Sequence, residues 1–165
     1  MTLTFLLGGA RSGKSALAVD LAKKAGEDVT FIATAEARDV EMTDRIALHR
    51  AERPGGWRTV EEPADLAAAL ATTDGVAVVD CLSLWVANLL ERRDDVPARS
   101  GEALACARER TRSTIVVSNE VGLGVVPATE LGRTYRDALG RVNAEWAAAA
   151  DEAFLVVAGR RLELR

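Results

Sequence analysis

The sequence GGARSGKS, residues 8–15, decides the fold expected for this chain. It matches the phosphate-loop pattern G-x-x-x-x-G-K-[ST], in which glycines let backbone N–H groups approach a polyphosphate at the start of a helix. The apolar run LTFLL (3–7) precedes it, and SALAVDLAKKAG (15–26) follows with helical composition. This order disfavours a chance glycine-rich turn and predicts nucleotide phosphate contacts from Gly8, Gly9, Ala10, Arg11, Ser12, Gly13, Lys14 and Ser15.

Within this loop, Lys14 is expected to reach the β- and γ-phosphates, and the Ser15 hydroxyl is expected to bind Mg²⁺. A phosphate loop also needs a carboxylate for the metal ion, and Asp80 ends the apolar run VAVVD (76–80) where that carboxylate normally lies. An aspartate that only caps the next helix is the alternative for Asp80, and both roles can coexist. We therefore expect Ser15 and Asp80 as the metal ligands.

Outside the loop, short apolar runs alternate with longer, alanine-rich segments. Five runs are predicted to be strands: LTFLL (3–7), VTFIA (29–33), VAVVD (76–80), TIVVS (114–118) and AFLVV (153–157). Helices are predicted near 14–25, 40–52, 63–71, 81–92, 101–110 and 129–149. Strands that are apolar on both faces and separated by helices predict a three-layer α/β fold of the P-loop NTPase type with a mostly parallel sheet. The alternating RLELR (161–165) predicts an antiparallel edge strand.

Length, charge and cysteine content bound the class of protein. The 165 residues are enough for one compact domain, so we expect 1–165 to be a single domain. The net charge of −4 provides no overall positive field that would favour nucleic acid or an anionic membrane. Cys81 and Cys106 lack CxxC and metal-ligand spacing, which predicts reduced thiols. The opening MTLTFLLGGA lacks a basic n-region, so we expect a cytoplasmic protein without stable membrane insertion.

The motifs that are missing narrow the class of phosphate-loop protein. No N-K-x-D motif for reading guanine occurs, which disfavours a GTPase of the signalling type. No helicase or transporter signature is evident either. A small enzyme that uses a nucleotide on a small molecule remains.

His49 is the only histidine of the chain and lies in RIALHRAERP (45–54), among three arginines. On a helix near 40–52 it shares a face with Met42 and Ile46, and arginines stand four residues before and after it. Nearby positive charge disfavours the imidazolium, which leaves a nitrogen lone pair free to attack a phosphorus atom. A half-buried histidine that packs beside Met42 and Ile46 is the alternative.

Several motifs occur in an order that identifies a family. They are GGARSGKS (8–15), FIATA (31–35), VEMTDRIALHR (40–50), ERPGGWRTVEEP (52–63), VSNEVGLGVVP (117–127) and GRVNAEWAAAADEAFLVVAG (140–159). Together they resemble the bifunctional adenosylcobinamide kinase/adenosylcobinamide-phosphate guanylyltransferase family of cobalamin biosynthesis over nearly the whole chain. The phosphate loop alone is generic, whereas its combination with R-I-x-x-H-[KR], R-P-x-x-W-R-T and S-N-E-V-G-x-G-x-V-P is specific.

The resemblance implies two reactions. In the family, ATP or GTP phosphorylates the hydroxyl of the aminopropanol arm of adenosylcobinamide, and GMP from GTP is then joined to adenosylcobinamide phosphate through a guanylylated histidine. His49 falls on the position of that nucleophile. The resemblance also implies that the GTP site is lined by Ala33, Thr34, Ala35, Arg50, Ala51, Glu52, Arg53 and Glu61; Asp80 is expected to face the same site because it ends an apolar strand. The alternative for Glu61 is a solvated position in an acidic loop. The resemblance also implies that the chain assembles as a homotrimer.

Three regions keep alternatives open. Glu120, in SNEVGLGVVP (118–127), is expected near the active site, where it binds magnesium, orients substrate or caps the strand. Trp57 either stacks on a ligand or packs in the core. ERRDDVPARSGE (91–102) predicts an exposed loop. The connecting region 91–112, between WVANLL and TIVVS, looks shorter than in the family. A different small-metabolite kinase and a nucleotide-binding regulator without catalysis remain the alternative functions.

Overall fold

The computed structural model of the chain describes residues 2–36 and 54–164. Its sheet has seven strands in the order β3-β2-β4-β5-β1-β6-β7. All neighbouring strands are parallel except β6 and β7, which form an antiparallel hairpin. The strands are β1 (Leu3–Gly8), β2 (Val29–Ala33), β3 (Arg58–Glu61), β4 (Val76–Asp80), β5 (Thr114–Asn119), β6 (Glu152–Val157) and β7 (Arg160–Leu164). The predicted parallel sheet and its antiparallel edge strand are confirmed.

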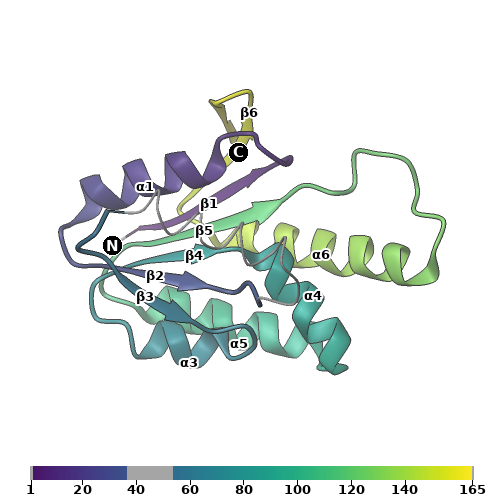
Figure 1. Ribbon diagram of the computed structural model, residues 1–165, viewed down its shortest axis with the longest axis horizontal. Helices are drawn as coiled ribbons and strands as arrows, with labels where there is room; N and C mark the ends of the chain where they lie inside the picture. The colour runs from purple at the N-terminus through teal and green to yellow at the C-terminus, as the bar shows by residue number, and fades with distance from the viewer. Residues whose placement is uncertain (1, 37–53, 165) are drawn as a thin grey trace.

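Helices cover the two faces of the sheet unequally (Figure 1). Among the described helices, α1 (Lys14–Ala25) lies on one face, and the remaining four lie on the other. Those four are α3 (Leu66–Ala71), α4 (Leu82–Arg92), α5 (Val96–Glu109) and α6 (Glu130–Ala149). The arrangement gives the three layers that the alternation of strands and helices predicts. The helix predicted near 40–52 lies outside the described residues.

The core follows from the two-residue period of the strands. Phe5 points into the core beneath α3–α6, whereas its neighbour Leu6 points into the core beneath α1, and both are fully buried. The long helix α6 contributes an apolar stripe to the core beneath α3–α6, where Leu139, Val142 and Trp146 are buried. Apolar burial on both faces explains why the central strands read as nearly continuous hydrophobic runs.

The structure corrects the prediction of an exposed loop over 91–102. Helix α4 continues to Arg92, and α5 begins at Val96. The side chain of Asp95 caps α5 by accepting a hydrogen bond from the backbone N–H of Ala98 at 3.1 Å. Pro97 lies in the first turn, where a proline loses no intrahelical hydrogen bond and its fixed φ favours the helix. The proline therefore marks the start of a helix and does not interrupt one.

Two further differences concern element bounds. Strand β3 (Arg58–Glu61) was not among the strands predicted from apolar runs, because only Thr59 and Val60 of its four residues are typical of strands. The helix predicted over 63–71 begins at Leu66, after a cap by Asp65.

Cys81 and Cys106 form no disulfide. In the described parts of the chain, no helix combines the length and apolar character needed to cross a bilayer.

Candidate functional site

The phosphate loop lies at the carboxyl end of β1, as the sequence predicts. Gly8 ends the strand, and Lys14 begins α1. A Cβ atom on Gly8 would stand 2.3 Å from the carbonyl oxygen of Val156 in β6, so only glycine fits there. Gly13 has a φ of +99°, in the left-handed region that glycine adopts without a steric penalty. The structure thus explains why glycine is required at positions 8 and 13 of the motif.

Lys14 is nearly buried and lies across its own loop. Its Nζ donates hydrogen bonds to the carbonyl oxygen of Gly9 at 2.6 Å and to the Ser12 hydroxyl at 3.3 Å. Burial lowers the pKa of Lys14, and electrostatic interactions with Cys81 and Asp80 oppose this shift. The ammonium group is thereby held over the turn whose backbone N–H groups face a polyphosphate in a phosphate loop.

The two predicted metal ligands lie together. The Ser15 hydroxyl donates to a carboxylate oxygen of Asp80 at 3.4 Å, although 65 residues separate them in sequence. Magnesium prefers oxygen ligands at about 2.1 Å in octahedral geometry, which places adjacent ligand oxygens about 3 Å apart. A hydroxyl and a carboxylate at this separation fit one Mg²⁺ ion. The cap of α4 is Cys81, one residue beyond Asp80.

The strand order explains how these groups meet. Strand β5 lies between β1, which carries the phosphate loop, and β4, which ends in Asp80. Gly8 pairs with Asn119 at the end of β5, and Asp80 pairs with Ala33 at the end of β2. The carboxyl ends of parallel strands therefore form one edge, which is where open α/β sheets bind ligands.

The segment at the end of β2 is fixed to the start of α4. Thr34 is fully buried, and its hydroxyl donates to the carbonyl of Cys81 at 2.8 Å and accepts from the N–H of the same residue at 2.9 Å. Ala33 is buried, Ala35 is half-buried, and exposed Glu61 pairs with Ala33 at the end of β3. The structure thus brings Glu61 to the same edge of the sheet as Asp80.

The predicted nucleophile lies outside the described residues. This applies to His49 and to the neighbouring positions Arg50, Ala51, Glu52 and Arg53. Asn88 of α4 joins the described segments on either side of this stretch, because its side-chain amide donates to the carbonyls of Thr34 at 2.8 Å and Pro63 at 3.0 Å. Trp57, for which stacking on a ligand was one option, packs against the core beneath α1.

A polar network next to Asp80 was missed by the sequence analysis. The Ser83 hydroxyl is 2.8 Å from the Cys81 sulfur and accepts from the Asn119 side chain at 3.0 Å. The Tyr135 hydroxyl donates to the Ser83 carbonyl at 3.1 Å. Burial raises the pKa of Tyr135 to about 12 and the pKa of Cys81 to about 11. The Tyr135 hydroxyl and the Cys81 thiol are therefore neutral near pH 7. In the sequence, the only indication of this network is the polar residue Asn119 at the end of an apolar strand.

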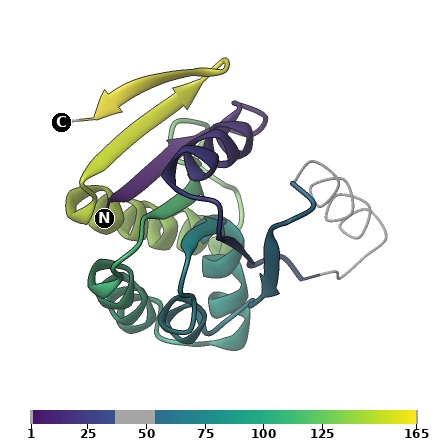
Figure 2. The same ribbon diagram turned by 90° about the vertical axis from the view of Figure 1, so that its left-hand side faces the viewer.

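The hairpin of β6 and β7 contacts the phosphate loop. Figure 2 shows this C-terminal hairpin beside β1, the strand that precedes the loop. Its two-residue turn, Ala158 and Gly159, has positive φ at both positions, as in a type I′ turn. The N–H of Gly159 donates to the carbonyl of Ser12 at 2.8 Å. The tip of this hairpin therefore contacts the phosphate loop directly.

Glu120 follows β5 and stabilises the next loop. Its backbone N–H donates to the carbonyl of Gly8 at 3.0 Å, next to the phosphate loop. Its carboxylate accepts from the N–H groups of Gly122 and Leu123, the latter at 3.1 Å. Of the roles left open for Glu120, the structure supports capping, applied to the turn that follows the strand.

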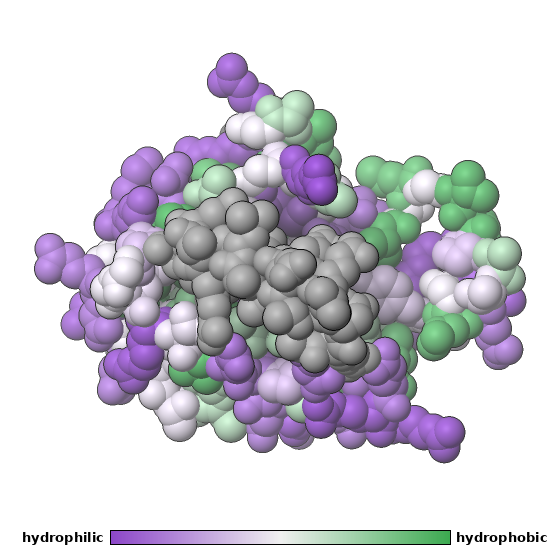
Figure 3. Space-filling view, in the orientation of Figure 1, coloured by the Kyte–Doolittle hydropathy of each residue, from purple (hydrophilic) through white to green (hydrophobic). Residues whose placement is uncertain are grey.

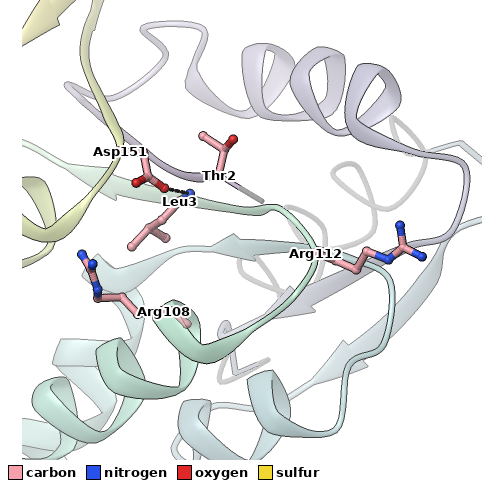
Figure 4. Close-up of a pocket in the computed structure, with 6 residues that line it drawn as sticks. Thr2, Leu3, Arg108, Arg112 and Asp151 are labelled. Carbon is pink, nitrogen blue, oxygen red and sulfur yellow. Dashed lines mark hydrogen bonds between the residues drawn. The ribbon is translucent and has the colours of Figure 1, made fainter.

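A hollow of about 30 Å³ lies at the opposite edge of the sheet, between Leu3, Arg108 and Asp151 (Figure 4). Asp151 accepts a hydrogen bond from the N–H of Leu3 at 2.7 Å. This volume holds about one water molecule. The hollow is at the amino ends of the strands and does not belong to the candidate site.

Two solved structures share the fold. The flagellar accessory protein FlaH from Methanocaldococcus jannaschii aligns with 97% of this chain and 74% of its own, with a TM-score of 0.52 and 15% identity. The RadB recombinase aligns with 93% of this chain and 73% of its own, with a TM-score of 0.50 and 17% identity. At this level of identity the likeness concerns the fold alone.

The sequence comparisons are more specific. The family model described as cobinamide kinase / cobinamide phosphate guanyltransferase matches residues 4–164. A bifunctional adenosylcobalamin biosynthesis protein, CobP of Pseudomonas aeruginosa, is 48% identical over 97% of this chain and 95% of its own. Proteins of the same description, named CobU, are 35% identical in Escherichia coli and 37% in Salmonella typhimurium, each over 99% of both chains. The chain therefore belongs to the cobinamide kinase / cobinamide phosphate guanyltransferase family.

Proposed function

We propose that this protein catalyses both reactions of its family: it phosphorylates adenosylcobinamide with ATP or GTP and then transfers GMP from GTP to adenosylcobinamide phosphate. The observation that supports the proposal best is the contact between Ser15 and Asp80 beside Lys14. This arrangement has the groups that position a nucleoside triphosphate and balance its charge.

In the proposed kinase step, the oxygen of the substrate hydroxyl attacks the γ-phosphorus, the bond to the β-phosphate oxygen breaks, the nucleoside diphosphate leaves, and the hydroxyl proton is released to solvent. Lys14 and the N–H groups of the loop stabilise the charge on the phosphate oxygens. Ser15 and Asp80 would hold Mg²⁺, which supplies further positive charge to the β- and γ-phosphates when it is bound. The phosphate loop and Asp80 align the γ-phosphorus with the attacking oxygen.

In the proposed transfer step, a ring nitrogen of His49 attacks the α-phosphorus of GTP, and pyrophosphate leaves. The product is a phosphoramidate between His49 and GMP. An oxygen of adenosylcobinamide phosphate then attacks the same phosphorus, the bond to the imidazole breaks, and adenosylcobinamide-GDP forms. We propose that the residues Arg50, Ala51, Glu52 and Arg53 line the nucleotide site, and that Glu61 reads the guanine base.

Labelling with radioactive GTP tests the proposal. The protein is incubated with Mg²⁺ and GTP labelled at the α- or the γ-phosphate, and bound label is detected on a denaturing gel. The intact mass of the protein is measured by mass spectrometry. We expect label only from the α-position, a mass gain of one GMP, lability in acid and stability in alkali. His49→Ala should abolish this label, whereas phosphorylation of cobinamide persists at a reduced rate.

Two results would contradict parts of the proposal. A His49→Ala protein that still transfers GMP to cobinamide phosphate at the wild-type rate would contradict the covalent mechanism. A protein that binds GTP but consumes none in the presence of cobinamide would be a regulator. We further propose, from the family resemblance, a homotrimer that works in the cytoplasm as a single-domain chain.

A further inference from the structure

The loop between β5 and α6 and the first turn of α6 expose several large apolar side chains. They are here called the apolar loop surface: Val121, Leu123, Val125 and Val126 of the loop, and Leu131 of α6. Leu123 is 87% exposed and Val125 is 96% exposed. The loop projects from the body of the molecule (Figure 1), and Figure 3 shows hydrophobic atoms gathered over it. Contiguous exposed apolar surface of this kind marks a binding site more often than an ordinary surface.

The backbone of this loop is held by its own polar groups. At its start, the Glu120 carboxylate accepts from the N–H groups of Gly122 and Leu123. At its end, Arg133 donates to the carbonyls of Pro127 at 3.0 Å and Ala128 at 2.9 Å. Polar contacts thus hold both ends of the loop, and the apolar side chains between them are exposed and accessible to a ligand.

The position of the loop relates it to the nucleotide site. The backbone of Glu120 is hydrogen-bonded to Gly8, so the loop leaves the sheet beside the phosphate loop. The residues from Val121 to Pro127 carry no charged side chain. A phosphate-bearing ligand would find no counter-charge on these residues, whereas a large neutral surface would lose contact with water there.

We propose that the apolar loop surface binds the corrin macrocycle of the cobinamide substrate while the aminopropanol arm reaches the phosphate loop. This inference rests on the proposed function and assigns the substrate's largest apolar part to named residues. The macrocycle carries methyl groups between its amide side chains, which gives it apolar contact area, and it is too large to enter the phosphate loop. Its binding must therefore take place on a surface that begins at the loop and extends away from it, as this one does.

The test uses the full chain and three variants. Leu123→Ser combined with Val125→Ser removes the two most exposed apolar side chains. Val125→Leu is the conservative variant. Leu162→Ser is the matched control, because Leu162 is 60% exposed on β7, outside the proposed surface. Cobinamide binding is measured by equilibrium dialysis with detection of corrin absorbance. The kinase KM is measured for cobinamide and for ATP, and oligomeric state by sedimentation velocity.

We expect the double variant to weaken cobinamide binding and to raise the KM for cobinamide by about tenfold or more, since two apolar side chains lose their contacts. The KM for ATP, the GMP label formed from GTP alone and the sedimentation profile should stay within about twofold of wild type, a margin small against that tenfold effect. Leu162→Ser should bind cobinamide as wild type does, and Val125→Leu, which keeps an apolar side chain, should bind it more tightly than the double variant.

Unchanged cobinamide binding in the double variant would overturn the proposal. An altered sedimentation profile would also overturn it, because the loop would then contact a second copy of the chain. A wild-type protein that binds cobinamide but phosphorylates none would contradict the proposed function alone, and dialysis of the variants would still decide the role of the loop.

Discussion

Replacing Gly8 by alanine should destabilise the fold, because this residue is where β1 and the phosphate loop meet β6. The added Cβ would lie 2.3 Å from the Val156 carbonyl oxygen and 2.8 Å from the Ser12 hydroxyl oxygen, whereas ordinary contacts begin at 3.4 Å. The Val156 carbonyl would have to move by about 1 Å, and it belongs to the backbone of a paired strand. Overpacking of this kind costs about 1–3 kcal/mol, which lowers the melting temperature by roughly 3–10 °C in a protein of this size.

Gly9→Ala is the matched control. It adds the same methyl group one residue later, where no atom beyond the neighbouring residues lies within 4 Å and φ is outside the left-handed region. We expect its free energy of unfolding to remain within about 0.5 kcal/mol of wild type. Urea unfolding followed by circular dichroism measures both variants, without nucleotide so that binding does not contribute. Equal stability of the Gly8→Ala and Gly9→Ala variants would refute the reasoning that Val156 forces glycine at position 8.

Four further predictions concern other parts of the molecule. Lys14→Ala should reduce both phosphorylation and GMP transfer by on the order of 100-fold, because both reactions hold a polyphosphate in the same loop; near-normal turnover by the folded variant would contradict this. Burial raises the pKa of Cys81 to about 11, so the thiol ionises at lower pH in the unfolded chain than in the folded one. The free energy of unfolding should therefore fall as pH rises from about 9 to 11, by up to about 1.4 kcal/mol per pH unit. Urea titrations of a Cys81→Ala variant should lack this part of the pH dependence. Arg110→Ala should destabilise the protein by about 2–4 kcal/mol, because the buried guanidinium donates hydrogen bonds to Thr114 and to the carbonyls of Leu70, Thr73 and Gly75. Arg112 is exposed, and Arg112→Ala is the control. A similar loss of stability in that variant would show that the loss of charge, and not of these hydrogen bonds, is responsible. Gly140→Ala, at an open position of α6, should stabilise by about 0.5–1 kcal/mol in thermal melts, and a lower melting temperature would disprove the open space at that position.

The parts of the fold that local chemistry determines could be predicted from the sequence. The phosphate-loop spacing predicted the turn between β1 and α1, and apolar runs predicted the other central strands. The contact between Ser15 and Asp80 could be predicted because Asp80 ends β4, and Ser15 lies in the first turn of α1, which follows the phosphate loop at the carboxyl end of β1. Alternation in RLELR also predicted the antiparallel strand β7.

The rest depended on partners that are distant in sequence. Nothing near Ser12 indicates that its carbonyl accepts from Gly159, and nothing near Ser83 indicates that Asn119 and Tyr135 meet it. The start of α5 was misjudged for a different reason. Asp and Pro favour both a loop and the first turn of a helix, and the apolar residues packed against the core decide between them.

The pairing of β1 has a consequence for the synthesis of the protein. This strand lies between β5 and β6, and the hydrogen bond from Thr4 to Glu152 spans 148 residues. A nascent chain therefore carries the complete phosphate-loop sequence early but lacks both strands that flank it until much later in translation. Non-local pairing of this kind slows folding. On the ribosome, the capacity to bind nucleotide should thus appear only after β6 has emerged, so shorter nascent chains should not be protected by GTP.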